Sequence, residues 1–196
     1  MTDNKAFVKG FFQPAISNAG TLDMIAQQFH PINIQKNELF LEEGKISNKY
    51  LILESGFMRA YSHDTEGNEV TTAFFNAGQP VFEVASFFMR IPSKENIQAL
   101  SPSAGYIIIF EELNKLFHSI PEFREFGRSI LVKGFASLKL RMLSMITETA
   151  EFRYAALLQS NPEIFMQAPL KQIASYLGIT DSSLSRIRRE MTKSQN

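Results

Sequence analysis

The spacing of apolar residues changes near residue 110, and this change constrains the fold more than any other feature of the chain. From about Phe29 to Phe110, short apolar runs recur at close intervals, separated by turns that contain glycine. Glycine takes the positive φ that tight hairpins require, so we expect many short antiparallel strands in a sandwich or barrel. From Glu111 to Ile120 the spacing is helical, and Pro121 ends this short helix. The sequence therefore predicts an α+β chain with an N-terminal antiparallel, jelly-roll-like sandwich or barrel followed by helices.

One long helix is expected from Pro121 to about Ile146, because proline is accepted in the first turn of a helix. At the usual rise per residue it would be about 39 Å long. Apolar residues at alternating spacings of four and three form a seam along it. They are Leu131, Phe135, Leu138, Met142 and Met145. Gly127 and Gly134 would let another helix approach closely, but two heptads do not distinguish a dimerisation helix from a long core helix within one domain.

A further helix is predicted from Thr147 to Ser160, with Thr147 as its N-cap. The dipeptide Asn161-Pro162 ends it. We interpret Ile164 to Met166 as a short strand that leads into the last part of the chain.

The segment QAPLKQIASYLGITDSSLSRIRREM near the C-terminus predicts two short helices joined by a tight turn. Pro169 opens the first helix, and its apolar residues fall at i, i+3, i+4 and i+7, which makes one buried face. Gly178 follows this helix and suits the left-handed conformation of a helix end. Thr180 is then a good N-cap for the second helix, with its hydroxyl accepting from the amide of Ser182 or Ser183.

The second helix separates apolar from polar residues sharply. Leu184, Ile187 and Met191 are expected to face the core. The opposite face carries hydroxyl and cationic groups, which can donate to phosphates and guanine edges in a DNA major groove. These residues are Ser182, Ser185, Arg186, Arg189 and Lys193, with Arg188 at the border and better placed for a flanking phosphate. The pattern is typical of a helix-turn-helix, although a plain helical hairpin with a solvated basic face has the same residues.

Composition excludes several other classes of function. There is no cysteine, so disulfides, thiolate nucleophiles and iron–sulfur clusters are excluded. The three histidines lie far apart and indicate no metal site, and no nucleotide-binding glycine loop or hydrolase motif occurs, so we expect a protein that is not an enzyme and has no cofactor. No apolar run is long enough for a membrane span or a secretion signal, which favours a cytoplasmic protein without a membrane partner. Net charge is zero, but from Leu170 to Asn196 five basic residues stand against two acidic ones.

With these features in the same order, the chain resembles the Crp/Fnr-type transcription regulators. The resemblance rests on the glycine-marked strand turns around FLEEG, YLILESGFMR and FNAG, and more specifically on Leu170 through Arg189. It implies a β-roll sensor domain over residues 1–120, a dimerisation helix over 121–146 and a winged helix-turn-helix domain over 147–196. It also implies double-stranded DNA, a second copy of the chain, RNA polymerase and a small-molecule effector as partners.

The resemblance further implies roles in DNA recognition. An arginine at the position of Arg186 reads a guanine in this family, and four matching positions touch bases or phosphates. These are Thr180, Asp181, Ser182 and Ser183. Asp181 and Ser182 depart from the Arg-Glu pair familiar in the family, which implies a different operator.

The sensor pocket departs from the pattern of members that bind cyclic nucleotides. Glu83 retains the acid that would hold a ribose hydroxyl, but Phe82 replaces the preceding glycine and Ser93 replaces the phosphate-binding arginine. A lone Lys94 is a poor substitute for a bidentate cation, and Arg90 would have to reach inward. We therefore expect a regulator whose effector is not cyclic AMP. Glu83 also fits a simpler role as a surface or helix-capping acid.

Two functions from different classes follow from these residues. The favoured one is a DNA-binding regulator in which a β-roll sensor is coupled to a helix-turn-helix. The other is an orphan β-roll binding module whose helical tail engages a protein partner, with Arg186, Arg189 and Lys193 merely solvated. Retention on heparin followed by salt-dependent duplex binding separates the two.

Overall fold

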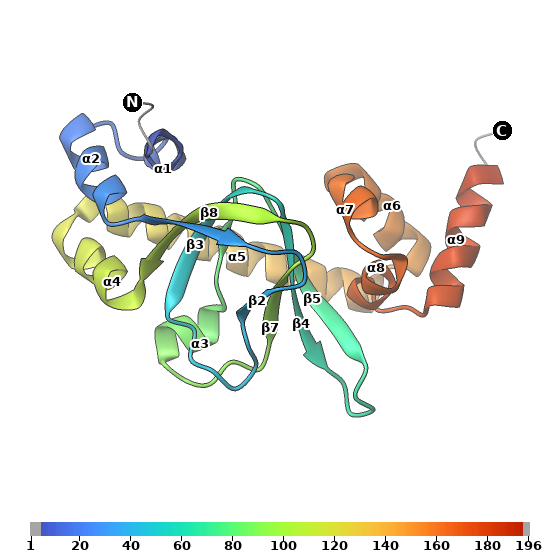
Figure 1. Cartoon of the computed structure of the whole chain (residues 1–196). Helices are drawn as coiled ribbons and strands as arrows, with labels where there is room; N and C mark the ends of the chain where they lie inside the picture. Colours follow the sequence, from blue (N-terminus) through green and yellow to red (C-terminus); the bar gives the residue numbers. More distant parts are fainter. Residues whose placement is uncertain (1–4, 194–196) are drawn as a thin grey trace.

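The computed structural model describes residues 5–193, except for the side chain of Lys193, and has the α+β architecture that the sequence predicts (Figure 1). The strands are β1 (His30–Ile34), β2 (Leu39–Leu41), β3 (Lys49–Ser55), β4 (Phe57–His63), β5 (Glu69–Asn76), β6 (Pro80–Val81), β7 (Asn96–Ala99) and β8 (Ser103–Ile109). The helices are α1 (Ala6–Phe12), α2 (Ala19–Gln27), α3 (Val84–Met89), α4 (Phe110–Ser119), α5 (Pro121–Thr147), α6 (Ala150–Ser160), α7 (Glu163–Gln167), α8 (Leu170–Tyr176) and α9 (Asp181–Lys193).

The strands form two antiparallel four-stranded sheets, in the orders β1-β8-β3-β6 and β2-β7-β4-β5. Side chains alternate between the faces of each strand, so Met58 and Ala60 of β4 enter the core between the sheets. Phe57 of the same strand points the other way, toward the C-terminal helices. Gly56 joins β3 to β4 with a φ of 98°, and a Cβ there would overlap Ser103. The expected β-roll is confirmed.

A second core, rich in phenylalanine, lies outside the first sheet, where α1, α2 and α4 meet it. Phe12 contacts Phe29, Phe123 and Phe126 at ring-centroid distances of 5.7, 5.2 and 5.1 Å. The sequence analysis did not identify α1 and α2, although Asn18 caps α2 by accepting from the amide of Thr21. These helices cover the end of the roll far from α9 (Figure 1).

The long helix α5 is confirmed and runs along the roll from α4 to α6 (Figure 1). Near its start Gly127 packs under α4, where a Cβ would overlap the ring of Phe117. At Gly134 a Cβ would meet open space. Only the first of the two glycines therefore serves a close contact within this chain.

Three local predictions are wrong. Thr147 is the last residue of α5, and Thr149 caps the next helix by accepting from the amide of Phe152 at 3.2 Å. Residues 164–166 lie in α7, where the amide of Ala168 reaches the carbonyl of Ile164 (2.9 Å), and they pair with no strand of either sheet. The expected wing has no strands among residues 5–193, because α9 contains no glycine or proline and stays helical through Lys193.

Candidate nucleic-acid interface and ligand cavity

The predicted helix pair is present as α8 and α9. Gly178 has a φ of 68°, the left-handed conformation expected of it, and a Cβ there would overlap the end of Met145. The hydroxyl of Thr180 accepts from the amide of Ser183 (3.2 Å), so Thr180 caps α9 as predicted. The buried side chains Leu184 and Ile187 fix the inner face of α9 against α8.

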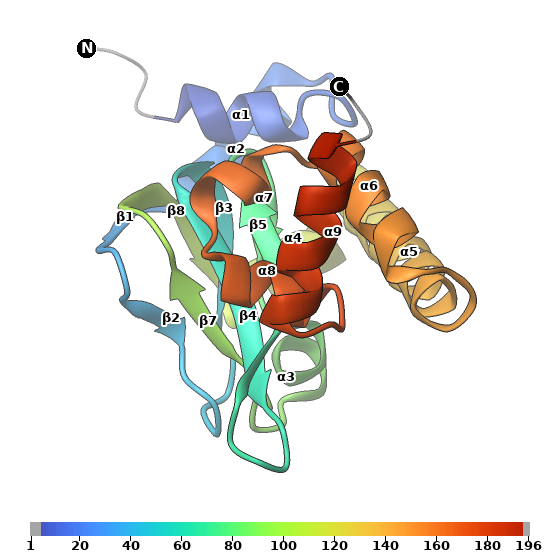
Figure 2. The same ribbon diagram turned by 90° about the vertical axis from the view of Figure 1, so that its right-hand side faces the viewer.

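The outer face of α9 is solvent-exposed in the described part of the chain (Figure 2). The exposed predicted residues are Thr180, Asp181, Ser182, Ser185, Arg186, Arg188 and Arg189. Ser183 is half-buried, and the predicted side chain of Lys193 lies outside the described residues. Hydroxyl and guanidinium donors thus lie along one accessible helix face.

A carboxylate from α6 lies near this face. The pKa of Glu151 is lowered by its own backbone amide and by the Thr149 hydroxyl, and to a smaller extent by the charge of Arg186. Arg186 is therefore close enough to Glu151 for their charges to interact, and this acid is part of the electrostatic surroundings that an approaching phosphate would meet.

Two arginines that the sequence analysis did not single out hold the turn between α8 and α9. Arg153 of α6 donates to the carbonyl of Leu177 (3.1 and 3.2 Å) and to that of Glu148 (2.7 Å). Arg141 of α5 donates to the carbonyl of Tyr176 (2.9 Å) and lies 4.1 Å from the centre of its ring. These bonds satisfy the orphan carbonyls at the end of α8.

A β-bulge in β5 receives the helix pair. Ala60 pairs with Ala73 but Tyr61 pairs with Thr71, so Thr72 is the extra residue. The amide of Thr71 donates to the hydroxyl of Ser175 on α8 (3.1 Å), and the carbonyl of Thr72 accepts from Arg141 (2.9 Å). At the bulge these two backbone groups are not used in pairing between strands, so they are available to bond α8 and α5.

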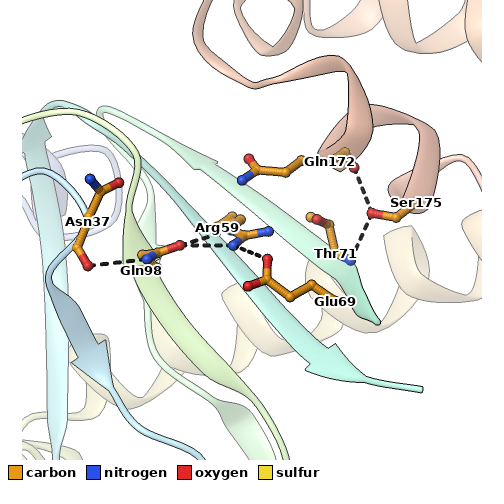
Figure 3. Close-up of polar contacts among 7 residues, drawn as sticks. All are labelled: Asn37, Arg59, Glu69, Thr71, Gln98, Gln172 and Ser175. Carbon is orange, nitrogen blue, oxygen red and sulfur yellow. Dashed lines mark hydrogen bonds and ion pairs between the residues drawn. The ribbon is translucent and has the colours of Figure 1, made fainter. Parts of the chain in front are cut away.

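The outer face of the second sheet carries an ion pair between buried Arg59 and exposed Glu69, beneath α8 (Figure 3). Arg59, of which 3% is exposed, donates to Glu69 (2.5 Å) and to the side-chain oxygen of Gln98 (2.9 Å). Figure 3 shows Gln172 of α8 lying above Arg59. The oxygens of Gln172, Thr71 and Asn76 are buried without a hydrogen-bond partner. Polar atoms are therefore buried in this interface without a hydrogen-bond partner, and each such atom lowers the stability of the fold by about 1–3 kcal/mol.

A cavity of about 680 Å³ lies between the inner side of the second sheet and α5. Glu83 is the one predicted effector residue in its lining. The side chain of Arg90 turns away to the carbonyl of Ser47 (2.9 Å) and the side chain of Asn48 (2.7 Å), and the exposed Lys94 is not part of the lining. The Glu83 carboxylate accepts from the amides of Ala85 and Ser86 and so caps α3, the simpler role that its sequence position allowed.

The cavity also contains polar groups that the sequence analysis did not select, namely Thr72, Glu95 and Arg141. Burial is the largest influence on Glu95 and raises the pKa of its carboxyl. Strand alternation identifies neither Glu95, which lies in the loop before β7, nor Arg141, which lies on a helix that is apolar on several faces.

The predicted seam of α5 is exposed along its length. The exposed fractions are 38% for Leu131, 73% for Phe135, 62% for Leu138, 45% for Met142 and 39% for Met145. Neighbouring apolar residues on α5 are exposed as well: Val132, Leu140, Leu143 and Ile146. Exposed apolar residues that line up along one seam of a helix are typical of an interaction site.

Two further features bear on partners. Within residues 5–193 no group of three or more potential metal ligands occurs, and His63 instead lies 3.2 Å from Glu43. In the same part of the chain no helix is both long and apolar enough to span a bilayer.

Comparison with known proteins agrees with this architecture. The family model of the cyclic nucleotide-binding domain matches residues 31–119, the roll with α4. The fumarate and nitrate reduction regulatory protein of Vibrio cholerae is 28% identical over 190 residues, which are 91% of this chain and 74% of that protein.

Solved structures share the fold. FixK2 from Bradyrhizobium japonicum superposes with a TM-score of 0.76 at 16% identity, covering 85% of this chain and 86% of that one. A protein from Eubacterium rectale assigned to the Crp/Fnr family superposes with a TM-score of 0.68 at 17% identity, covering 90% and 84%. The roll, the long helix and the helix pair occur in the same order as in these regulators, so the chain is similar to the Crp/Fnr-type transcription regulators over most of its length.

Proposed function

We propose that this regulator binds double-stranded DNA as a homodimer, with α9 as the recognition helix in the major groove. The observation that carries the proposal is the outer face of α9, where exposed donors such as Ser182, Ser185 and Arg186 stand on a helix anchored by buried Leu184 and Ile187. Recognition helices present their N-terminal residues to base edges, and Arg186 is the sixth residue of α9.

The proposed dimer forms through the seam of α5. Nothing in the described chain covers Phe135 and Leu138, whose side chains are exposed by 73% and 62%. A second copy of the same helix, related by a two-fold axis, would bury this surface. Two recognition helices would then read an inverted repeat with half-sites about one helical turn apart.

The proposal divides the chain into a sensor over residues 1–120, a dimerisation helix over 121–146 and a DNA-binding unit over 147–196. Arg141 supports coupling between them, because it lines the cavity and holds both β5 and α8. RNA polymerase would be a further partner of the DNA-bound dimer.

Selection from random duplexes, followed by salt titrations of the selected sequence, tests the proposal. We expect an inverted repeat, and an affinity that falls steeply with salt because arginine–phosphate contacts release counterions. The absence of duplex binding at low salt, with and without cell extract to supply an effector, would overturn it in favour of a module whose helices bind a protein.

A further inference from the structure

The cavity beside α5 has the size and character of a small-molecule site. Its volume of about 680 Å³ lies within the range of about 300–1,000 Å³ that ligand pockets occupy. Most of its wall is apolar, with contributions from the sheet and from the helix. Examples are Ala60, Ala73, Phe75, Ile97, Leu131 and Phe135.

Two of the charged groups in the wall are already engaged. Both terminal nitrogens of Arg141 donate to backbone carbonyls, and its guanidinium stacks on Tyr176. The Glu83 carboxylate accepts from two amides at the start of α3. A ligand that took over the hydrogen bonds of Arg141 or Glu83 would break contacts that hold α8 or α3.

Glu95 and Thr72 are the groups left to face a ligand. The Thr72 hydroxyl is buried without a hydrogen-bond partner of ordinary geometry, although it lies close enough to Glu95 to lower the pKa of that carboxyl. Burial outweighs this effect and raises the pKa, and the negative charge of Glu83 raises it further. The Thr72 hydroxyl and the positive charge of Arg141 therefore stabilise the ionised carboxylate only in part, and a cationic donor from a ligand would stabilise it further.

We propose that this cavity binds a ligand with an apolar body and one protonated amine. The amine donates hydrogen bonds to the Glu95 carboxylate and to the Thr72 hydroxyl oxygen. Anionic ligands are disfavoured, because they would meet two carboxylates and a guanidinium whose two terminal nitrogens already donate to backbone carbonyls. The proposal deepens the regulator function by naming the chemical class of its effector, but binding of the amine does not require DNA.

Such a ligand would touch the elements that set DNA affinity. Leu131, Phe135 and Leu138 belong both to the cavity wall and to the dimer seam, and Arg141 belongs both to the wall and to the contact with α8. A ligand in the cavity would therefore change how two copies of α5 pair and where the helices α8 and α9 lie relative to the roll.

Calorimetric titration of the full chain with decylamine, decanol and decanoate tests the proposal, each probe being kept below its micellar concentration. We expect decylamine to bind about tenfold more tightly than decanol, which corresponds to one charge-assisted hydrogen bond. Decanoate should bind more weakly than either. Glu95→Gln should reduce decylamine affinity to that of decanol and leave decanol binding unchanged, whereas the exposed control Glu42→Gln should keep the tenfold preference.

Variants that fill the cavity give an independent readout. At Gly134 a Cβ meets open space, so Gly134→Leu can fold while its side chain occupies the cavity, and both decylamine and decanol should bind less well. Thr72→Val keeps the shape of a β-branched residue and replaces Glu95→Gln as the test if that variant unfolds. It should lower the affinity for decylamine and leave the affinity for decanol unchanged.

Equal affinity for the three probes, tightest binding of decanoate, or no binding to the folded protein would each overturn the proposal. These titrations contain no DNA. Loss of duplex binding therefore leaves their outcome standing, and loss of amine binding leaves the DNA-binding proposal standing.

Discussion

At the residue scale, the surroundings of a charged side chain decide what it can bind. Arg186 is exposed on the outer face of α9, whereas Arg141 uses both terminal nitrogens on backbone carbonyls. Sequence position alone suggested Arg90 as an inward cation, yet its guanidinium donates to Ser47 and Asn48 and lies 4.3 Å from the centre of the Phe110 ring. The same chemical group is thus an exposed donor in Arg186, a link between helix and sheet in Arg141 and a local contact in Arg90.

Arg186 and Arg189 should have different roles in DNA binding. Arg186→Ala should cost about 1–3 kcal/mol per half-site and relax preference at one base pair, because it removes a base contact. Arg189→Ala should weaken all sequences alike and lower the slope of log affinity against log salt by about one per subunit. Selections and salt titrations of both variants measure this. Loss of specificity in the Arg189 variant, with a merely uniform loss in the Arg186 variant, would reverse the roles.

Glu95 should make stability depend on pH. Because burial raises the pKa of Glu95, its ionised form destabilises the native state, and this cost appears as pH rises through the folded pKa. Below the ordinary carboxyl pKa of about 4.3 both states are protonated and the cost vanishes. Glu95→Gln should therefore raise the unfolding temperature near neutral pH, with a gain that shrinks on acidification. A gain independent of pH would point to packing instead.

At the element scale, α5 connects three surfaces. Its first turns pack against α4 through Gly127, its middle lines the cavity, and its last turns touch the helix pair, where Met145 contacts Gly178. A helix with so many roles is apolar on several faces, so periodicity alone leaves its partner undetermined. The exposed seam indicates that one face is unpartnered within the described chain.

Leu138→Glu should convert the dimer to a monomer. A carboxylate buried in a helix seam without a partner costs several kcal/mol. Sedimentation at micromolar concentration measures the mass of the wild type, of this variant and of the control Lys139→Glu, which changes an exposed neighbour on α5. A monomeric wild type, or a dimeric Leu138→Glu, would contradict the assignment of the seam.

Arg141→Met should loosen α8 from the roll. The substitution keeps an apolar stem but removes the donors to the Thr72 and Tyr176 carbonyls, bonds of a type that contributes about 1.5–3 kcal/mol each. Amide hydrogen exchange should then quicken in the peptide that covers α8, with little change in β3. Lys139→Met, an exposed lysine on the same helix, is the matched control. Unchanged exchange in α8 would show that apolar packing alone holds the contact.

At the scale of the whole molecule, the C-terminal helices and the roll share a core. Phe57 of β4 packs with Ile173, Ala174 and Leu177 of the C-terminal helices. The contact also buries the unpartnered oxygens of Thr71, Asn76 and Gln172, whose cost offsets part of the apolar gain.

Cyclic AMP should not bind in the manner of the nucleotide-binding relatives. Among the described lining residues the cavity holds two carboxylates, and both terminal nitrogens of Arg141 already donate to backbone carbonyls, so a bidentate contact with a phosphate diester would compete with those bonds. Calorimetry at tens of micromolar nucleotide should show no heat of binding. Sub-micromolar affinity that disappears in Glu83→Ala would contradict this expectation.

Local sequence determined the elements of this protein. Glycine-marked turns and short apolar runs specify the antiparallel strands, and Pro121, Gly178 and Thr180 specify where helices begin and end. The outer face of α9 could also be identified from sequence, because a helix of known register separates its faces by spacing alone.

Tertiary structure decided what those elements contact. Ile164–Met166 became helical, Glu83 became a helix cap and Glu95 rather than Lys94 reached the cavity, since each outcome depends on neighbours distant in sequence. The contact of the bulge at Thr72 with Arg141, beside α8, also depends on residues distant in sequence. Spacing along one chain records which side of an element is apolar, but the partner of that side is set only when the elements pack together.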